Sequence, residues 1–209
     1  MSEPRFIHLR VHSAYSLLEG AMHVKTLPAR AAAMDMPAIG ITDRNNLFGA
    51  LEFSEAAAKA GVQPVMGLQL ALSYVEPAPG QRAPEPAPIA LYAKDEAGWL
   101  NLMALSSAAF LDTDAGALPQ VPPEALEAHS DGVICLTGGA DGPLARLILA
   151  NRAAEAQALA ERLRDAFPDR LYVEIGRHGA GDALRTAAEA ASEPGLIELA
   201  HGLELPLVA

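Results

Sequence analysis

Residues 6–13 read Phe-Ile-His-Leu-Arg-Val-His-Ser, in which apolar side chains alternate with His8, Arg10 and His12. This period of two predicts a strand over residues 6–11. Two later segments also place polar side chains at the end of a strand-like run: Ile41-Thr-Asp-Arg-Asn-Asn46 and Gly67-Leu-Gln69. A βα-barrel gathers its functional side chains at strand ends, so we expect these three segments to form one site.

The residue types in these segments point in two chemical directions. His8, His12 and Asp43 are of the kind that bind a divalent cation. Arg10 and Arg44 carry permanent positive charge and cannot act as ligands. The segments therefore resemble a metal site in which some ligands have been exchanged for other residues.

Strand-like and helix-like runs alternate along the whole chain. The predicted strands are Phe6–Val11, Pro37–Ile41, Val62–Tyr74, Ile89–Ala93, Gly132–Leu136, Leu171–Ile175 and the start of one at Leu205–Ala209. The predicted helices are Val24–Met34, Phe48–Lys59, Ala97–Phe110, Ala153–Phe167 and Ala183–His201. Repeated βα units predict parallel strands covered by helices, so the fold class is α/β, either a barrel or an open sheet.

Two features bear on the extent of the domain. Residues 76–88 contain so many prolines that we expect a surface loop there, inside a single domain spanning residues 1–209. The chain ends within an apolar run, and we expect from this that the barrel is truncated at its C-terminus.

Composition narrows the function classes. The formal net charge is −11, which repels phosphate backbones, so we expect no direct grip on DNA by this segment. No apolar run approaches the ~20 residues that span a bilayer, and the N-terminus lacks the apolar core of a signal peptide. The single cysteine, Cys135, lies in an apolar run and is expected to be a buried thiol. We expect a cytoplasmic protein.

Six motifs in order resemble one family. They are His8–Gly20, Ile41–Gly49, Gly61–Gly67, Tyr92–Leu102, Gly132–Gly138 and Asp169–Ile175. Together they are similar to the PHP (polymerase and histidinol phosphatase) domains found at the N-terminus of bacterial replicative DNA polymerase III α subunits. The resemblance covers the chain from Phe6 to Ala209. It implies a distorted, TIM-like βα-barrel of seven strands.

Family members with an intact site hold a trinuclear metal cluster that hydrolyses phosphoesters. This sequence departs from the ligand pattern at Arg10, Arg44, Gln69, Pro88 and Gly139. Ligand-type residues remain at His8, His12, Asp43 and His178, and the family's last motif would fall beyond Ala209. We expect a remnant metal-site pocket consisting of His8, Arg10, His12, Asp43, Arg44, Gln69 and His178, with no catalytic residue.

An arginine about 4 Å from a cation repels it by about 4 kcal/mol per unit charge at an effective dielectric constant of 20. We therefore expect no metal cofactor in this segment, although residual zinc or manganese binding is a second possibility. We further expect Arg10 and Arg44 to replace the cations by pairing with Asp43. The magnesium of nucleotidyl transfer would belong to a polymerase palm further along the parent chain.

The resemblance implies a scaffold within a DNA-directed DNA polymerase, a nucleotidyltransferase of DNA replication. The implied partners are the rest of the polymerase chain and the proofreading 3′–5′ exonuclease subunit. One alternative is an active metal-dependent phosphoesterase or 3′–5′ exonuclease, with His8, His12, Asp43 and His178 as its ligands. Another keeps the fold but assigns the domain to the error-prone α-subunit paralogue.

Overall fold

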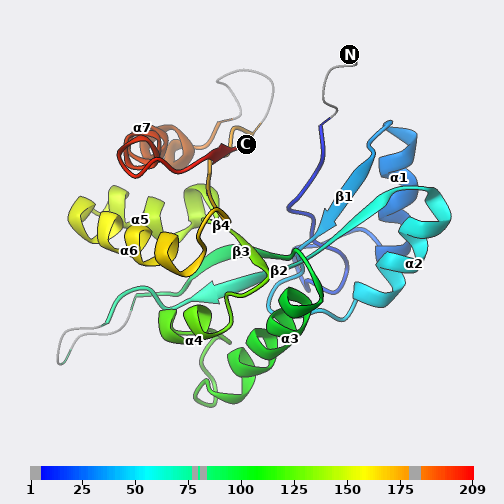
Figure 1. The fold of residues 1–209 in the computed structure, drawn as a ribbon, viewed down its shortest axis with the longest axis horizontal. Coiled ribbons are helices and arrows are strands. Elements are labelled where there is room, and N and C mark those ends of the chain that lie inside the picture. Colours follow the sequence, from blue (N-terminus) through cyan, green and yellow to red (C-terminus); the bar gives the residue numbers. More distant parts are fainter. Residues whose placement is uncertain (1–5, 77–79, 81–83, 179–184) are drawn as a thin grey trace.

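One curled sheet of six strands organises the described part of the molecule (Figure 1). The computed structural model describes residues 6–76, 80, 84–178 and 185–209. The strands follow chain order across the sheet: β1 Ala38–Ile41, β2 Gln63–Leu72, β3 Ala87–Ala93, β4 Val133–Leu136, β5 Leu171–Glu174 and β6 Leu207–Val208. The sheet forms a half-barrel, which confirms the α/β class and the TIM-like curvature.

The expectation of an all-parallel sheet is wrong at β3. Strand β1 runs parallel to β2, and β4, β5 and β6 are mutually parallel, but β3 is antiparallel to both β2 and β4. A parallel pair needs a long crossover, usually through a helix, whereas an antiparallel pair can be joined directly. The connection between β2 and β3 is the proline-rich segment, whose composition does not permit such a helix.

The predicted loop over residues 76–88 ends two residues later than the structure allows. Ala87 and Pro88 already belong to β3, where they pair with Leu72 and Ala71 of β2. Strand β4 pairs with β3 only from Ala90 onward, so the missing N–H of Pro88 interrupts no ladder on that side. Residues 77–79 and 81–83 of this loop lie outside the described residues.

The N-terminal segment is extended, but it is not one of the six strands. The Gly40 amide donates to the His8 carbonyl at 2.7 Å, and the Thr42 amide donates to the Val11 carbonyl at 2.9 Å. These two bonds place residues 8–11 beside β1, where a further strand of a barrel would lie. Polar side chains on this segment consequently face the same region as the residues that follow β1.

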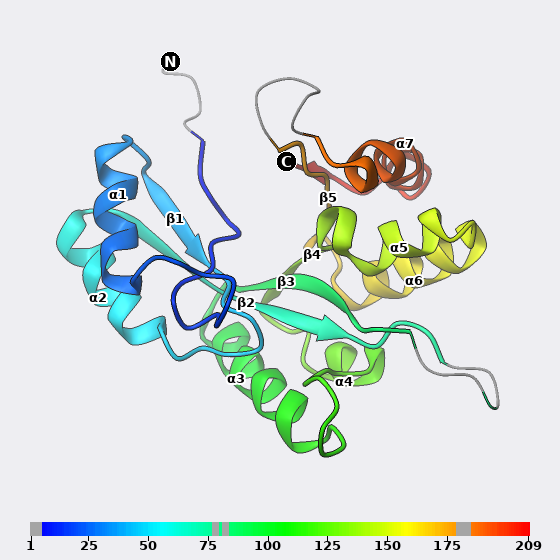
Figure 2. The same cartoon turned by 180° about the vertical axis from the view of Figure 1, so that it is seen from behind.

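Helices cover the sheet in three groups (Figures 1 and 2). The helical elements are η1 Val24–Thr26, α1 Leu27–Ala33, α2 Ala50–Ala60, α3 Glu96–Leu111, α4 Pro123–Ala128, η2 Gly139–Asp141, α5 Pro143–Leu149, α6 Ala153–Ala166 and α7 Ala187–Gly202. Helices α1 and α2 lie near β1, α3 and α4 lie below the centre of the sheet, and α5 to α7 stack at the other end. The five predicted helices are present, whereas α4 and α5, each of which has proline at its first turn, were not predicted.

Among the described residues, three apolar clusters pack on the sheet. The larger core contains Leu68, Leu70 and Leu72 of β2 and extends under α3 to α7, and it includes the buried thiol of Cys135. A smaller core around Phe53 packs α1 and α2 against β1. Among the described residues, no helix combines the length and the apolar character needed to cross a membrane. The third cluster consists of Ala90, Tyr92 and Leu136 on β3 and β4.

Candidate functional site

Asp43 is the most deeply buried of the predicted site residues. It follows β1, and only 2 % of its surface is exposed. Its Oδ1 accepts hydrogen bonds from the Ser13 amide at 2.7 Å and from the Ser16 hydroxyl at 2.6 Å. Its Oδ2 accepts from the Ser13 hydroxyl at 2.7 Å. We call Ser13, Ser16 and Asp43 the Asp43 cluster.

The expected pairing of Asp43 with the two arginines is wrong. Three short donors from the turn after residue 12 occupy the carboxylate instead, and hydrogen bonds to a charged acceptor of this kind are among the stronger ones. The Arg44 main chain joins this cluster, since its amide donates to the Ser16 hydroxyl at 3.0 Å. Asp43 thus fixes the first turn to the end of β1.

The arginines take part in a second, more exposed arrangement, which we call the arginine chain. Each member contacts the next through a side-chain nitrogen on one residue and a side-chain oxygen on the other. In order, the members are Arg44, Glu19, His12, Gln69, Arg10 and Glu174.

The outer half of the arginine chain is centred on Glu19. Its Oε1 lies 2.6 Å from Arg44 Nη2, and its Oε2 lies 3.3 Å from His12 Nδ1. The Arg44 side chain is 51 % exposed, so solvent screens much of this attraction. His12 is held from both sides, because its Nε2 lies 3.2 Å from Gln69 Oε1. Both ring nitrogens of His12 are therefore already in contact with protein oxygens.

The inner half of the arginine chain is centred on Arg10. Its Nη1 donates to Glu174 Oε1 at 2.9 Å, and its Nη2 donates to Gln69 Oε1 at 3.2 Å. A Cβ atom built on Gly139 would lie in ordinary contact with Arg10 Nη1, at 3.7 Å. Gly139 is one of the positions where the resemblance predicts a ligand, so the guanidinium lies beside a predicted ligand position.

Two buried oxygens near Arg10 complete the inner half. Within the described part of the chain, the Tyr92 hydroxyl and Glu174 Oε2 have no hydrogen-bond partner. Burial raises the pKa of Tyr92 well above its usual range, and the nearby Glu174 carboxylate raises it further. The phenol therefore stays neutral beside the Arg10–Glu174 pair.

The remaining two predicted residues form no hydrogen bond or ion pair with the described members of either group. The His8 ring packs edge-on against Phe6, with centroids 4.8 Å apart, and lines a pocket of about 560 Å³ together with Arg10 and His12. The His178 side chain is 81 % exposed and its Nδ1 bonds Glu189 Oε1. Glu189 belongs to the capping box that starts α7, so His178 is attached to a helix end.

These donors do not fit a metal centre. Among the residues that the structure describes, no three His, Cys, Asp or Glu side chains are grouped so that they could hold an ion. Arg10 and Arg44 contribute two fixed positive charges, each of which repels a divalent cation at ~4 Å by about 8 kcal/mol at an effective dielectric constant of 20. Asp43, the best remaining ligand, is fully engaged by serines.

Sequence reasoning missed several residues that hold this site together. The predicted site included neither Ser13 and Ser16 nor Glu19 and Glu174. Glu174 is the last residue of β5 and the one before the end of the predicted strand over residues 171–175, and that position was the available signal. Glu19 precedes Gly20 inside a turn, where nothing in the sequence indicates that it contacts Arg44.

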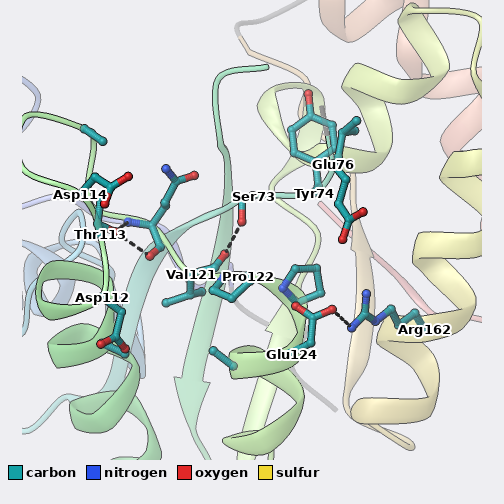
Figure 3. Close-up of a pocket in the computed structure, with 16 residues that line it drawn as sticks. Ser73, Tyr74, Glu76, Asp112, Thr113, Asp114, Val121, Pro122, Glu124 and Arg162 are labelled. Carbon is teal, nitrogen blue, oxygen red and sulfur yellow. Dashed lines mark hydrogen bonds and ion pairs between the residues drawn. The ribbon is translucent and has the colours of Figure 1, made fainter. Parts of the chain in front are cut away.

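A separate pocket of about 600 Å³ lies away from these groups (Figure 3). Its walls come from the end of β2, the C-terminus of α3, the start of α4 and one residue of α6. Figure 3 shows Arg162 reaching Glu124, whose carboxylate it contacts at 2.6 Å, and Ser73 bonded to the Val121 carbonyl at 3.2 Å. The residues of the predicted site do not line it.

Comparisons with known proteins give a consistent family. The family model described as PHP domain matches residues 8–178. The chain is 45 % identical over 204 residues to DNA polymerase III subunit alpha of Caulobacter vibrioides, covering 98 % of the chain and 17 % of that relative. It is 37 % identical over 207 residues to the protein of the same name from Rickettsia bellii, covering 99 % and 17 %. The chain thus spans about a sixth of the length of these relatives.

The fold also has a solved counterpart. A candidate metal-dependent phosphoesterase from Bifidobacterium adolescentis superimposes with a TM-score of 0.53 at 13 % sequence identity, covering 98 % of this chain and 87 % of that one. At this identity the similarity supports the partial barrel alone.

Proposed function

Since the chain belongs to the PHP domain family, we propose that it is a hydrolytically silent scaffold domain of a replicative DNA polymerase III α subunit and a docking platform for the proofreading 3′–5′ exonuclease. The observation that carries the proposal is the arginine chain. Arg10 and Arg44 occupy two predicted ligand positions and are already paired with Glu174 and Glu19.

The chemistry of the site supports silence. Metal-dependent phosphoester hydrolysis needs a cation that activates water and neutralises charge on the phosphate. Arg10 instead donates hydrogen bonds to Gln69 and Glu174, which connects the N-terminal segment to β2 and β5. We infer that the residues at this mouth of the half-barrel stabilise the fold and do not catalyse hydrolysis.

The named relatives support the choice of parent. Both relatives described above are called DNA polymerase III subunit alpha, and this chain corresponds to 17 % of each. Nucleotidyl transfer and its magnesium would then belong to the rest of the parent chain, which acts in the cytoplasm. The same names favour the replicative form over the error-prone paralogue.

Charge supports a protein partner in preference to DNA. A net charge of −11 opposes association with a phosphate backbone but does not oppose contact with a protein. In this proposal the exonuclease docks on the domain, and proofreading chemistry is performed by that separate subunit.

The test of silence is hydrolysis of bis-p-nitrophenyl phosphate by the purified chain in the presence of manganese or zinc. We expect no rate above that of the metal alone. A rate that is saturable and abolished by chelation would establish the active phosphoesterase instead.

The test of docking is co-elution of the full parent α subunit with its exonuclease subunit in size-exclusion chromatography. We expect a complex for the full subunit and its loss when residues 1–209 are deleted. A complex that survives this deletion unchanged would overturn the docking role without affecting the conclusion on silence.

A further inference from the structure

Helix α3 is apolar on two opposite sides. Its buried side packs into the larger core through Leu102, Leu105 and Ala109. The residues from 97 to 111 include no charged side chain, and a helix that is apolar all round is normally covered on both sides. Four large apolar side chains on its outer side are between 38 and 81 % exposed, and we call them the α3 face: Leu100, Met103, Phe110 and Leu111.

The spacing of the α3 face suits a second helix as its ligand. At about 3.6 residues per turn, these four positions form one stripe along the helix. Helix α3 has 16 residues, which corresponds to a length of about 24 Å. Figures 1 and 2 show it at the lower edge of the described part of the molecule. Stripes of this kind receive the apolar face of an amphipathic helix.

The pocket drawn in Figure 3 adjoins the C-terminal end of the α3 face, since Ala108 and Asp112 line it and Leu111 directly precedes Asp112. Figure 3 shows Asp112 and Asp114 on one side of the pocket and Glu76 and Glu124 on the other. We call it the acidic pocket, because its charged lining residues are four carboxylates and one guanidinium: Glu76, Asp112, Asp114, Glu124 and Arg162.

The negative charge of the acidic pocket is not balanced by the described residues. Arg162 lies 2.6 Å from Glu124 and also contacts Glu127, so two carboxylates share its single charge. In the part of the chain that the structure describes, Asp112 and Asp114 have no ion-pair partner. Both follow the C-terminus of α3, which carries a partial negative charge and has no basic residue in its last turn. A cation supplied from outside would therefore be stabilised here.

The acidic pocket suits a basic side chain better than a metal ion. Among the described residues, no three His, Cys, Asp or Glu side chains are grouped closely enough to hold an ion. Apolar walls at Val75, Val121 and Pro122 line the same pocket. Arginine and lysine pack an apolar stem against such walls while the charged head remains near the carboxylates. DNA and anionic lipid would instead be repelled.

We propose that the α3 face and the acidic pocket form one docking surface for an amphipathic helix of a second protein. The helix lies along α3, and an arginine or lysine at its end enters the pocket. The α3 face alone would accept any apolar segment, whereas the adjoining pocket selects a segment with positive charge at one end. A second copy of this chain is disfavoured, because each copy has a net charge of −11.

The proposed surface goes beyond the docking role described above, because it has a stated location and a stated partner chemistry. It applies to any partner with that chemistry and does not depend on the exonuclease.

The test is fluorescence anisotropy of a labelled synthetic peptide with the full-length parent subunit, without other subunits. The peptide is an amphipathic helix of about 15 residues, with leucines on one face and two arginines at one end. We expect saturable one-to-one binding, and binding at least about fivefold weaker for a matched peptide with glutamines in place of the arginines. No saturable binding of the arginine peptide would overturn the inference, including the case in which the rest of the subunit covers α3.

Two double variants separate the apolar and the charged parts of the surface. Phe110→Ser with Leu111→Ser removes apolar area, and Asp112→Asn with Asp114→Asn removes charge. Each double variant should weaken binding of the arginine peptide by about tenfold. All four side chains are exposed, so the unfolding temperature should stay unchanged.

Matched controls exclude a general attraction to an acidic protein. Leu17→Ser alters a leucine that is 83 % exposed elsewhere, and Glu55→Gln with Glu198→Gln removes two exposed carboxylates from α2 and α7. We expect both controls to bind the arginine peptide within about twofold of the unaltered subunit. Equal weakening in the controls and in the α3 variants would overturn the inference.

The two peptides and the double aspartate variant form a double-mutant cycle. We expect the preference for arginine over glutamine to disappear in Asp112→Asn with Asp114→Asn. A preference that persists would show that the arginines bind elsewhere, which contradicts the inference. Specific peptide binding, together with an exonuclease complex that survives deletion of residues 1–209, would overturn the exonuclease role alone, so the two failures are distinguishable.

Discussion

The Asp43 cluster and the arginine chain lie at the same mouth and derive from the same predicted ligand set, yet they are built in opposite ways. Asp43 is buried and receives three hydrogen bonds from two neighbouring serines. The arginine chain is partly exposed and joins five segments through long charged or polar side chains. A residue of ligand type can thus serve as a structural anchor.

The difference predicts unequal contributions to stability. Buried hydrogen bonds to a carboxylate keep their strength, whereas exposed ion pairs lose most of theirs to solvent screening. The Asp43 cluster should therefore contribute more to the free energy of unfolding than the arginine chain does. Within the arginine chain, the inner half should contribute more than the outer half.

The largest expected effect is that of Asp43→Ala. It removes three bonds and leaves the buried Ser13 and Ser16 hydroxyls without their acceptor, so we expect the free energy of unfolding to fall by about 4 kcal/mol. Urea denaturation measures this, with the exposed Asp114→Ala as control within about 0.5 kcal/mol. A loss below about 1 kcal/mol would show that the cluster is not an anchor.

Arg10→Ala should have an intermediate effect. It removes the partner of Glu174, whose side chain is 15 % exposed, and one of the two donors to Gln69. We expect a loss of about 2 kcal/mol, and only partial rescue by Arg10→Lys, because one ammonium cannot reproduce two separated donors. Full rescue by lysine would mean that only the charge matters.

Arg44→Ala should have a small effect. Half of this side chain is exposed, so its pairing with Glu19 contributes about 0.5 kcal/mol and should vanish in 1 M salt. Denaturation at low and high salt checks this. If the free energy of unfolding fell as much as in Arg10→Ala, the distinction between the inner and outer halves of the arginine chain would be contradicted.

The smallest expected effect separates His178 from both groups. The Thr186 amide and the His178 ring hold the pKa of Glu189 below its ordinary value of 4.5. A carboxyl with a lowered pKa stabilises the fold above its unfolded pKa, and this stability is lost as the pH falls below about 4.5 toward the folded pKa.

Glu189→Gln should therefore reduce proton uptake on unfolding, by up to about one proton, as the pH falls below about 4.5, and it should leave the pH dependence of stability near pH 7 unchanged. The slope of unfolding free energy against pH, measured for both proteins, checks this. If the slope below pH 4.5 were the same in both proteins, the contact between His178 and Glu189 would not hold this carboxyl in its charged form, and His178 would have to be reassigned.

Much of the fold was predictable because hydrophobic periodicity determines strands and helices locally. The positions of strands β1 to β6 and of helices α1, α2, α3, α6 and α7 follow from it. The antiparallel orientation of β3 does not, because strand direction depends on how a connection returns through space. The assignment of residues 6–11 as a strand was also wrong, since only two main-chain bonds attach them to β1.

The site was predictable in its residue types but not in its pairings. Motif spacing placed His12, Asp43 and Gln69 near one another, and the structure confirms contacts among Arg10, His12 and Gln69. Motif spacing provided no information on Glu19 or Glu174. Their contacts with Arg44 and Arg10 span 25 and 164 positions of sequence, and contacts at such separations depend on tertiary structure.

The central claim is that arginines have replaced cations at this mouth, and bound metal tests it most directly. The unaltered chain and a triple variant (Arg10→His, Arg44→His and Gln69→Glu) are incubated with zinc and manganese, desalted and analysed for metal content. We expect below about 0.1 ion per chain in the first and about one ion in the second, because the variant exchanges two cations for imidazoles and an amide for a carboxylate. Two or more ions on the unaltered chain would contradict the claim.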